Sequence, residues 1–129
     1  PQAAWATAFA DERARLLAAA GSLPFVLEHV GSTAVPNLPA KPILDLLGGR
    51  PPDAAVAPYV SALGAAGYRH RGAHGIAGRD YFVRDDDTGR RTHHLHLVVE
   101  GGALWTAQLA FRDYLRAHPL RAAAYAALK

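Results

Sequence analysis

The segment 43–47 constrains the fold of this chain more than any other. Its five residues contain a single charge, Asp45, so the run predicts a buried β-strand, and the Gly48-Gly49 pair predicts its end. A lone carboxylate on a buried strand is costly unless it is paired or binds a metal. Two interpretations follow. Asp45 is a ligand for Mg²⁺, with Lys41 neutralising a nearby phosphate, or it is a strand-end residue in a salt bridge with an arginine.

The residues before this strand predict one helix and another strand. Apolar residues share one face at helical spacing in the first segment: Trp5, Phe9, Leu16 and Ala20. Gly21 then predicts the end of that helix. Residues 25–30 are typical of a strand. The proline-containing segment 31–42 is typical of a loop, so the chain reaches Asp45 from a strand through a loop.

The residues after this strand predict a helix and a hairpin. Residues 52–67 favour a helix, in which Pro58 marks the true start or a kink. A short strand is expected within 68–71. Residues 81–83 and 92–99 lie on either side of a turn cluster, which predicts two strands joined as a hairpin.

Two helices are expected at the end of the chain. Residues 104–118 have the apolar spacing of an amphipathic helix, and Pro119 lies where it can begin a last helix. The residues expected to face inward in the first of these are Leu104, Phe111 and Leu115. The order of elements predicts one domain over residues 1–129, of α/β or α+β class, with a mixed β-sheet flanked by helices.

Composition limits the classes of function. Apolar residues make up 50% of 129 residues, which is enough for one core. The 14 basic and 11 acidic residues are scattered, which argues against a dedicated nucleic-acid groove and leaves room for a local phosphate site. The absence of cysteine excludes disulfides, thiolate metal sites and a cysteine nucleophile. No apolar run approaches the roughly 18 residues of a membrane span. We expect a cytoplasmic protein without membrane contact, and the oligomeric state stays open.

The turn after the first strand is a candidate phosphate site. The strand runs into Gly31-Ser32-Thr33. Glycine lets a backbone approach a ligand closely, and exposed amides with two hydroxyls can cradle a phosphate. The alternative is an ordinary strand-to-loop turn with a local hydroxyl hydrogen bond.

The segment 92–99 places two histidines side by side. Alternate residues of a strand share a face, so His94 and His96 lie together while His93 lies on the opposite face. Two neighbouring histidines suit a metal, a phosphate or acid–base chemistry, and the alternative is a half-solvated polar face. On the following helix, Arg112 and Arg116 lie one turn apart, where they either reach an anion together or form a solvated face.

Several strings taken together resemble the GrpB family, and they cover nearly the whole chain. They are residues 28–36 (EHVGSTAVP), 41–45 (KPILD), 67–68 (GY), 94–97 (HLHL), 111–119 (FRDYLRAHP) and 125–129. The resemblance implies a nucleotidyltransferase-like fold, in which a Gly-Ser pair follows one strand and metal-binding carboxylates lie on the next. Gly31, Ser32 and Asp45 match that layout. Leu47 stands where a second carboxylate is expected, which argues against two-metal transfer. The resemblance also implies a further helical segment after the position of Lys129, which this chain lacks.

These observations predict a metal-dependent nucleotidyltransferase-like protein that acts on or binds a nucleoside triphosphate or another phosphorylated small molecule. Asp45 would hold Mg²⁺, His94 or His96 would complete a reduced metal site, and Asp45 and His96 are the candidate catalytic residues. The expected phosphate-binding residues are Gly31, Ser32, Thr33, Lys41 and Arg112. We expect one cleft to bring together Gly31, Ser32, Lys41, Asp45, His94 and His96.

Two other functions remain open from the sequence. Leu47 favours a catalytically inactive ligand-binding or accessory domain that keeps the fold. The pair His94 and His96 favours a histidine-based hydrolase or metalloenzyme. Neither the substrate nor the acceptor follows from the residues.

Overall fold

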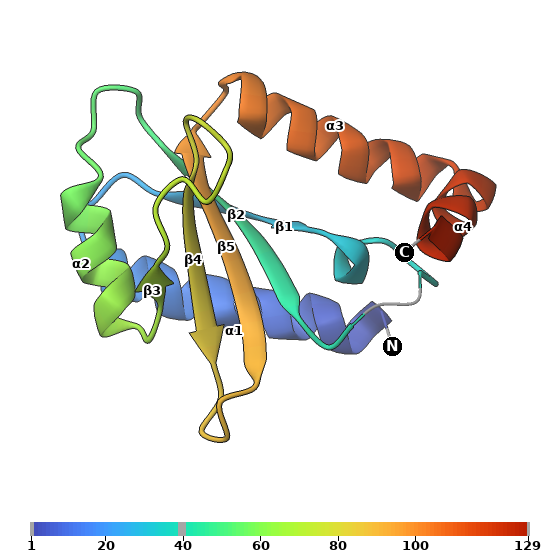
Figure 1. The fold of residues 1–129 in the computed structure, drawn as a ribbon, viewed down its shortest axis with the longest axis horizontal. Coiled ribbons are helices and arrows are strands. Elements are labelled where there is room, and N and C mark those ends of the chain that lie inside the picture. Colours follow the sequence, from blue (N-terminus) through green and yellow to red (C-terminus); the bar gives the residue numbers. More distant parts are fainter. Residues whose placement is uncertain (1, 39–40, 129) are drawn as a thin grey trace.

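The computed structural model describes residues 2–38 and 41–128, which form a mixed five-stranded sheet with helices on both faces (Figure 1). The elements in chain order are α1 (Gln2–Ala20), β1 (Val26–Val30), the 3-10 helix η1 (Ser32–Ala34), β2 (Leu44–Arg50), α2 (Ala57–Ala65), β3 (Arg69–His70), β4 (Asp80–Asp85), β5 (Arg91–Val99), α3 (Ala103–Ala117) and α4 (Pro119–Leu128). The fold class is therefore mixed α+β, as predicted. Among the described residues, no helix has the length and apolar character needed to cross a membrane.

The sheet has the order β1-β2-β5-β4-β3. The central pair, β2 and β5, is parallel, and the other neighbouring strands are antiparallel. Asp45 lies opposite Val30 on one side and opposite His94 on the other. The predictions that Asp45 lies on a strand beside the one ending at Val30, and that β4 and β5 form a hairpin, are confirmed.

The two faces of the sheet have separate cores. Leu16 of α1 and two residues of α2, Tyr59 and Leu63, pack against one face. The sheet residues of that core include Leu27, Leu44, Leu46, Phe82, Leu95 and Leu97. On the other face, α3 packs Leu104, Trp105 and Leu109 on a smaller cluster of Val30, Leu47 and Val98. In Figure 1 the second half of α3 extends past the end of β1 toward α4. Successive side chains of a strand point to opposite faces of the sheet, so every second residue of β2 and β5 faces α3.

Two expected boundaries are wrong. Strand β2 continues through Gly48 and Gly49 to Arg50, because these glycines make room for aromatic rings. A Cβ on Gly48 would lie 2.8 Å from Cε1 of Phe25, and one on Gly49 would lie 2.9 Å from Cζ3 of Trp105. Helix α2 begins at Ala57, not at residue 52, which confirms the alternative that Pro58 marks its true start. Pro58 lies in the first turn, where a missing N–H costs nothing.

Phe111 corrects a third expectation, because its side chain does not enter the core. It is 45% exposed. Leu104 and Leu115 do pack inward, at the two ends of α3. Phe111 has the helical spacing of an inward residue, but it lines a cavity instead.

Candidate functional site

A cavity of about 250 Å³ lies where α3 passes over the turn between β1 and η1. Its polar lining comes from Gly31, Ser32, Asp45, Gln108 and Arg112. Its apolar lining comes from Val35, Leu38, Phe111, Leu115 and Tyr125. We call the first set of residues the polar wall of the cavity and the second set its apolar wall.

Gly31 presses the turn against Asp45. Its φ is +77° and its ψ is −173°, a conformation that side-chain-bearing residues avoid. A Cβ here would lie 2.8 Å from both Cβ and Cγ of Asp45. Among the described residues, the backbone amides of Gly31 and Ser32 have no hydrogen-bond acceptor. Glycine thus sets two free amide donors next to a carboxylate.

Within the described residues, Asp45 is paired only with histidines. Its Oδ1 lies 3.2 Å from Nδ1 of His94 and 4.0 Å from Nε2 of His96. Its side chain is 22% exposed, and no arginine pairs with it in the part of the chain that the structure describes. The interpretation as a strand-end salt bridge with an arginine is therefore wrong. The carboxylate lies at the cavity without a permanently charged partner.

His96 is neutral and held in one tautomer. Burial lowers its pKa to about 4, although the Asp45 carboxylate acts in the opposite direction. Nη1 of Arg79 lies 3.2 Å from its Nδ1. A guanidinium only donates, so Nδ1 accepts and the proton is on Nε2, toward Asp45. Arg79 thereby fixes His96 as a donor that faces the carboxylate.

The ring of Tyr81 contacts both histidine rings. Its ring centroid lies 5.5 Å from that of His94 and 5.3 Å from that of His96. The guanidinium of Arg79 lies 4.8 Å from the centre of the same ring. As predicted, His94 and His96 share a face and His93 lies on the other. Neither Arg79 nor Tyr81 was identified as a site residue from the sequence. The loop before β4 brings Arg79 there, and the pairing of β4 with β5 sets Tyr81 opposite His96.

Arg112 lines the cavity but already has acidic partners. Its Nη1 donates to Oε1 of Glu28 at 2.7 Å and to the carbonyl of His29 at 3.1 Å, and its Nε donates to Asp113 at 2.9 Å. Its Nη2 makes no hydrogen bond within the described residues. Arg116 donates from Nε to the carbonyl of Ala34 at 2.8 Å. The two arginines fasten α3 to the β1–η1 turn, and Arg112 keeps one donor free.

Two expected phosphate ligands lie elsewhere. Thr33 is 2% exposed, and its hydroxyl is 2.8 Å from Nε2 of His29. His29 in turn stacks on Phe9 of α1, with ring centroids 5.1 Å apart. Thr33 therefore holds the turn together instead of lining the cavity. Lys41 is exposed and does not belong to the cavity lining.

The carboxylate and histidines do not form a ready-made metal cage. Within residues 2–38 and 41–128, no group of three or more histidine, cysteine or acidic side chains is arranged to hold a metal ion. Asp45 is the one acidic residue of the described cavity lining. Leu47, the next residue of β2 on the same face, is fully buried under α3. The site thus offers one carboxylate from the protein.

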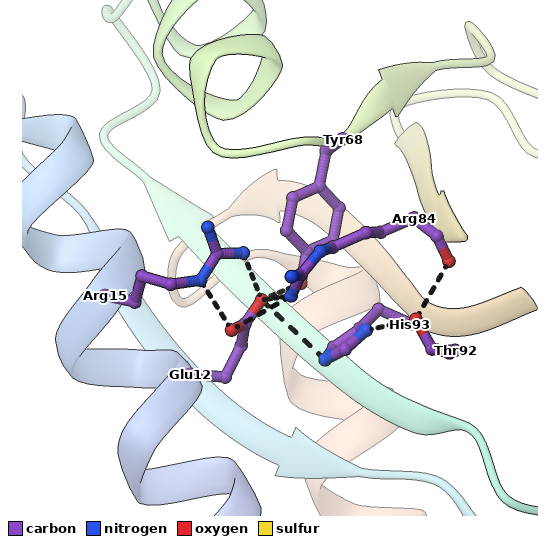
Figure 2. A network of polar contacts seen from close by, with 6 residues as sticks. All are labelled: Glu12, Arg15, Tyr68, Arg84, Thr92 and His93. Carbon is purple, nitrogen blue, oxygen red and sulfur yellow. Dashed lines mark hydrogen bonds and ion pairs between the residues drawn. The ribbon is translucent and has the colours of Figure 1, made fainter. Parts of the chain in front are cut away.

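On the opposite face of the sheet, a second carboxylate, Glu12, lies at the centre of a polar cluster, drawn in Figure 2. Both oxygens of Glu12 on α1 accept hydrogen bonds from Arg15, each at 2.8 Å. Oε2 also accepts from the hydroxyl of Tyr68 at 2.6 Å and from Nη1 of Arg84 at 3.2 Å. Nε2 of His93 lies 3.8 Å away. The side chain of Glu12 is 7% exposed, so this cluster is closed to ligands.

The partners of Glu12 determine its charge state. Burial alone would raise its pKa, but the hydrogen bonds from Arg15 and Tyr68 outweigh burial and lower it to about 2. A sequence signal for this cluster existed. Glu12 lies three residues after Phe9 and four before Leu16, within the apolar stripe of α1.

The comparisons with known proteins agree on one family. A family model described as GrpB protein matches residues 1–129. The UPF0157 protein YqkA of Bacillus subtilis is 42% identical over 125 residues, which are 97% of this chain and 36% of that protein. The glutamate-rich protein GrpB of Alkalihalophilus pseudofirmus is 34% identical, over 97% of this chain and 74% of that protein. The chain thus spans about a third of the first relative and about three quarters of the second.

A solved structure has the same fold. The crystal structure of the conserved protein GrpB from Enterococcus faecalis superposes with a TM-score of 0.84 at 35% identity. The match covers 97% of this chain and 75% of that one.

Proposed function

The chain belongs to the GrpB family, and from that premise we propose that its cavity binds a phosphorylated small molecule through Mg²⁺ held by Asp45. A nucleoside triphosphate is the first candidate, and nucleotidyl transfer is the candidate reaction. One observation carries the proposal. Asp45 stands at a cavity beside the free amides of Gly31 and Ser32, and its only polar partners among the described residues are histidines.

The charges at the cavity explain why a cation is needed. His96 is neutral at pH 7, since its pKa is about 4. The charge of Arg112 is offset by Glu28 and Asp113. A bare triphosphate would therefore meet the Asp45 carboxylate without a compensating positive charge. Mg²⁺ binds carboxylate and phosphate oxygens together, so it would join the two.

Other groups near Asp45 also have roles in this proposal. The amides of Gly31 and Ser32, with the Ser32 hydroxyl, donate to phosphate oxygens. Nη2 of Arg112 supplies one further charged donor. His94 and His96 orient Asp45 through their ring nitrogens and leave its second oxygen, Oδ2, for the cation.

A calorimetric titration with the four nucleoside triphosphates tests the proposal. We expect binding with Mg²⁺ and at least about tenfold weaker binding with a chelator or in Asp45→Asn, which keeps the size and removes the charge. Asp53→Asn, an exposed carboxylate in the loop before α2, is the matched control. Binding that survives both the chelator and Asp45→Asn contradicts the metal role of Asp45. The absence of binding by any triphosphate contradicts the proposal itself.

A second candidate is a ligand-binding domain without turnover. Leu47 favours it, because a fully buried leucine stands where a second metal-binding carboxylate would be expected. With one carboxylate, a two-metal clamp on attacking and leaving oxygens cannot form from β2 alone. Pyrophosphate release from bound triphosphate separates the two: its presence supports transfer or hydrolysis, and binding without release supports the accessory domain.

A further inference from the structure

We propose that the apolar wall of the same cavity binds a planar aromatic ring, of the nucleobase kind, that is attached to the phosphorylated ligand. This inference rests on the proposed function and narrows its ligand class. A ligand that is only phosphate would leave this wall unused, and an aliphatic group would not stack on its aromatic ring.

The first support is the way α3 faces the cavity. Gln108, Phe111, Arg112 and Leu115 all line it. At 3.6 residues per turn, these four positions fall on one stripe of the helix, and at 1.5 Å per residue they span roughly 10 Å. That stripe places Phe111 beside Arg112. One ligand can therefore contact the polar wall and the apolar wall together.

The second support is the exposure of Phe111. It is 45% exposed, although it lies on the stripe of α3 that faces the protein. Its ring lies 5.2 Å from that of Tyr125 on α4, at an interplanar angle of 76°. In such an edge-to-face pair a neighbouring ring covers at most one face, so Tyr125 leaves at least one face of Phe111 uncovered. An aromatic face at the rim of a cavity is suited to stacking.

The third support is the shape of the remaining wall. Val35 and Leu115 are almost fully buried and Leu38 is half-buried. All three line the same cavity as Asp45 and give it apolar surface. Its volume of about 250 Å³ is slightly below the roughly 300–1,000 Å³ common for small-molecule sites. That size favours one ring system with its phosphates over a polymer or a large second substrate.

The test compares inorganic tripolyphosphate with ATP, both with Mg²⁺, by calorimetry. On the unaltered protein we expect ATP to bind at least about tenfold more tightly, because only ATP carries a ring. Base–aromatic stacking predicts that Phe111→Ala weakens ATP binding by roughly 5-fold to 100-fold and leaves tripolyphosphate binding unchanged. Phe111→Leu keeps an apolar side chain but removes the ring, so it should behave like Phe111→Ala.

The matched control is Tyr114→Ala. Tyr114 is an exposed aromatic residue of the same helix that does not line the cavity, so its loss should leave ATP binding unchanged. Equal affinities for ATP and tripolyphosphate on the unaltered protein overturn the aromatic subsite while the proposed function stands. Unchanged ATP binding by Phe111→Leu also overturns the subsite, since a general apolar contact would then suffice. If neither probe binds, the proposed function fails and this inference fails with it.

Discussion

Glu12 and Asp45 are two acidic residues on opposite faces of one sheet, and their surroundings differ in a way that separates stability from binding. Each lies near a histidine of β5, and those two histidines, His93 and His94, are neighbours in the chain. Glu12 accepts hydrogen bonds from Arg15, Arg84 and Tyr68 and is nearly inaccessible. In the part of the chain that the structure describes, the polar partners of Asp45 are histidines alone, and Asp45 lines a cavity.

The difference shows what makes a buried carboxylate available. A carboxylate whose lone pairs are taken by arginines and a hydroxyl has no capacity left for a ligand, and losing it leaves those donors unpaired. A carboxylate whose partners are histidines instead of arginines keeps capacity for a ligand and can accept a cation. We therefore expect loss of the Glu12 carboxylate to act on folding and loss of the Asp45 carboxylate to act on binding.

The largest effect on stability is expected from Glu12→Gln. The change removes the charge that pairs with two guanidinium groups and should lower the free energy of unfolding by about 3 kcal/mol. That figure is at the low end for a buried pair because Arg15 and Arg84 are partly exposed. Urea denaturation monitored by circular dichroism measures it. A loss below about 1 kcal/mol would mean that the cluster in Figure 2 contributes little to folding.

Gly31→Ala should destabilise the protein by about 2 kcal/mol, because it adds a clash with Asp45 to the strain of a positive φ. Gly101→Ala is the control. Gly101 also has a positive φ, +75°, but a Cβ there would meet nothing within 4 Å. Comparing the stability lost by the two variants in thermal unfolding separates the steric clash with Asp45 from the backbone strain of a positive φ. Equal losses would contradict the tight packing of the β1–η1 turn against Asp45.

The pH dependence of stability should change below pH 6.5. Burial lowers the pKa of His29 to about 4 from the 6.5 of an unfolded histidine. Its contribution is therefore complete above pH 6.5 and is lost as pH falls toward 4, because the unfolded state takes up the proton first. Between pH 6.5 and 5.5 this loss is about 1 kcal/mol.

Urea denaturation across that range, with His29→Gln as the comparison, tests this expectation. The variant should show a shallower decline. Glu12 acts in a different window, since its lowered pKa contributes stability above about pH 4.5 that disappears as pH falls toward 2. An identical pH profile for His29→Gln would contradict the assignment.

The smallest effect on stability is expected from Asp45→Asn, within about 0.5 kcal/mol of the unaltered protein. Asparagine keeps the contact with Gly31 and still offers an oxygen to Nδ1 of His94. Urea denaturation, as for Glu12→Gln, measures this change in the free energy of unfolding. A loss comparable to that of Glu12→Gln would make Asp45 a structural residue and would remove the distinction between the two faces.

Local patterns in the sequence were enough to predict most of the fold. The apolar run around Asp45 gave a central strand, and alternation in β5 placed His94 and His96 together and His93 apart, because strand parity depends on neighbouring residues only. Gly48 and Gly49 misled the prediction, since the rings of Phe25 and Trp105 that they accommodate come from distant segments.

The site could be predicted only in part, because tertiary packing completes it. Gly31, Ser32 and Asp45 stood out from their own neighbourhoods, and all three line the cavity. Phe111 looked like a core residue, since helical spacing cannot show that α3 extends past the edge of the sheet. Thr33 looked like a phosphate ligand, but His29 takes its hydroxyl. Such assignments depend on which groups meet across the fold.

The most direct test of the division between the two faces is the stabilisation gained from Mg²⁺ and ATP by three proteins: the unaltered chain, Glu12→Gln and Asp45→Asn. At 100 times its dissociation constant a ligand adds about 2.7 kcal/mol to the free energy of unfolding. We predict that gain for the unaltered chain and for Glu12→Gln, despite the lower starting stability of Glu12→Gln. For Asp45→Asn, whose affinity is expected to be at least about tenfold lower, we predict a gain of about 1.4 kcal/mol or less at the same ligand concentration. A full gain for Asp45→Asn, or its loss in a folded Glu12→Gln, would contradict the assignment of binding to the α3 face.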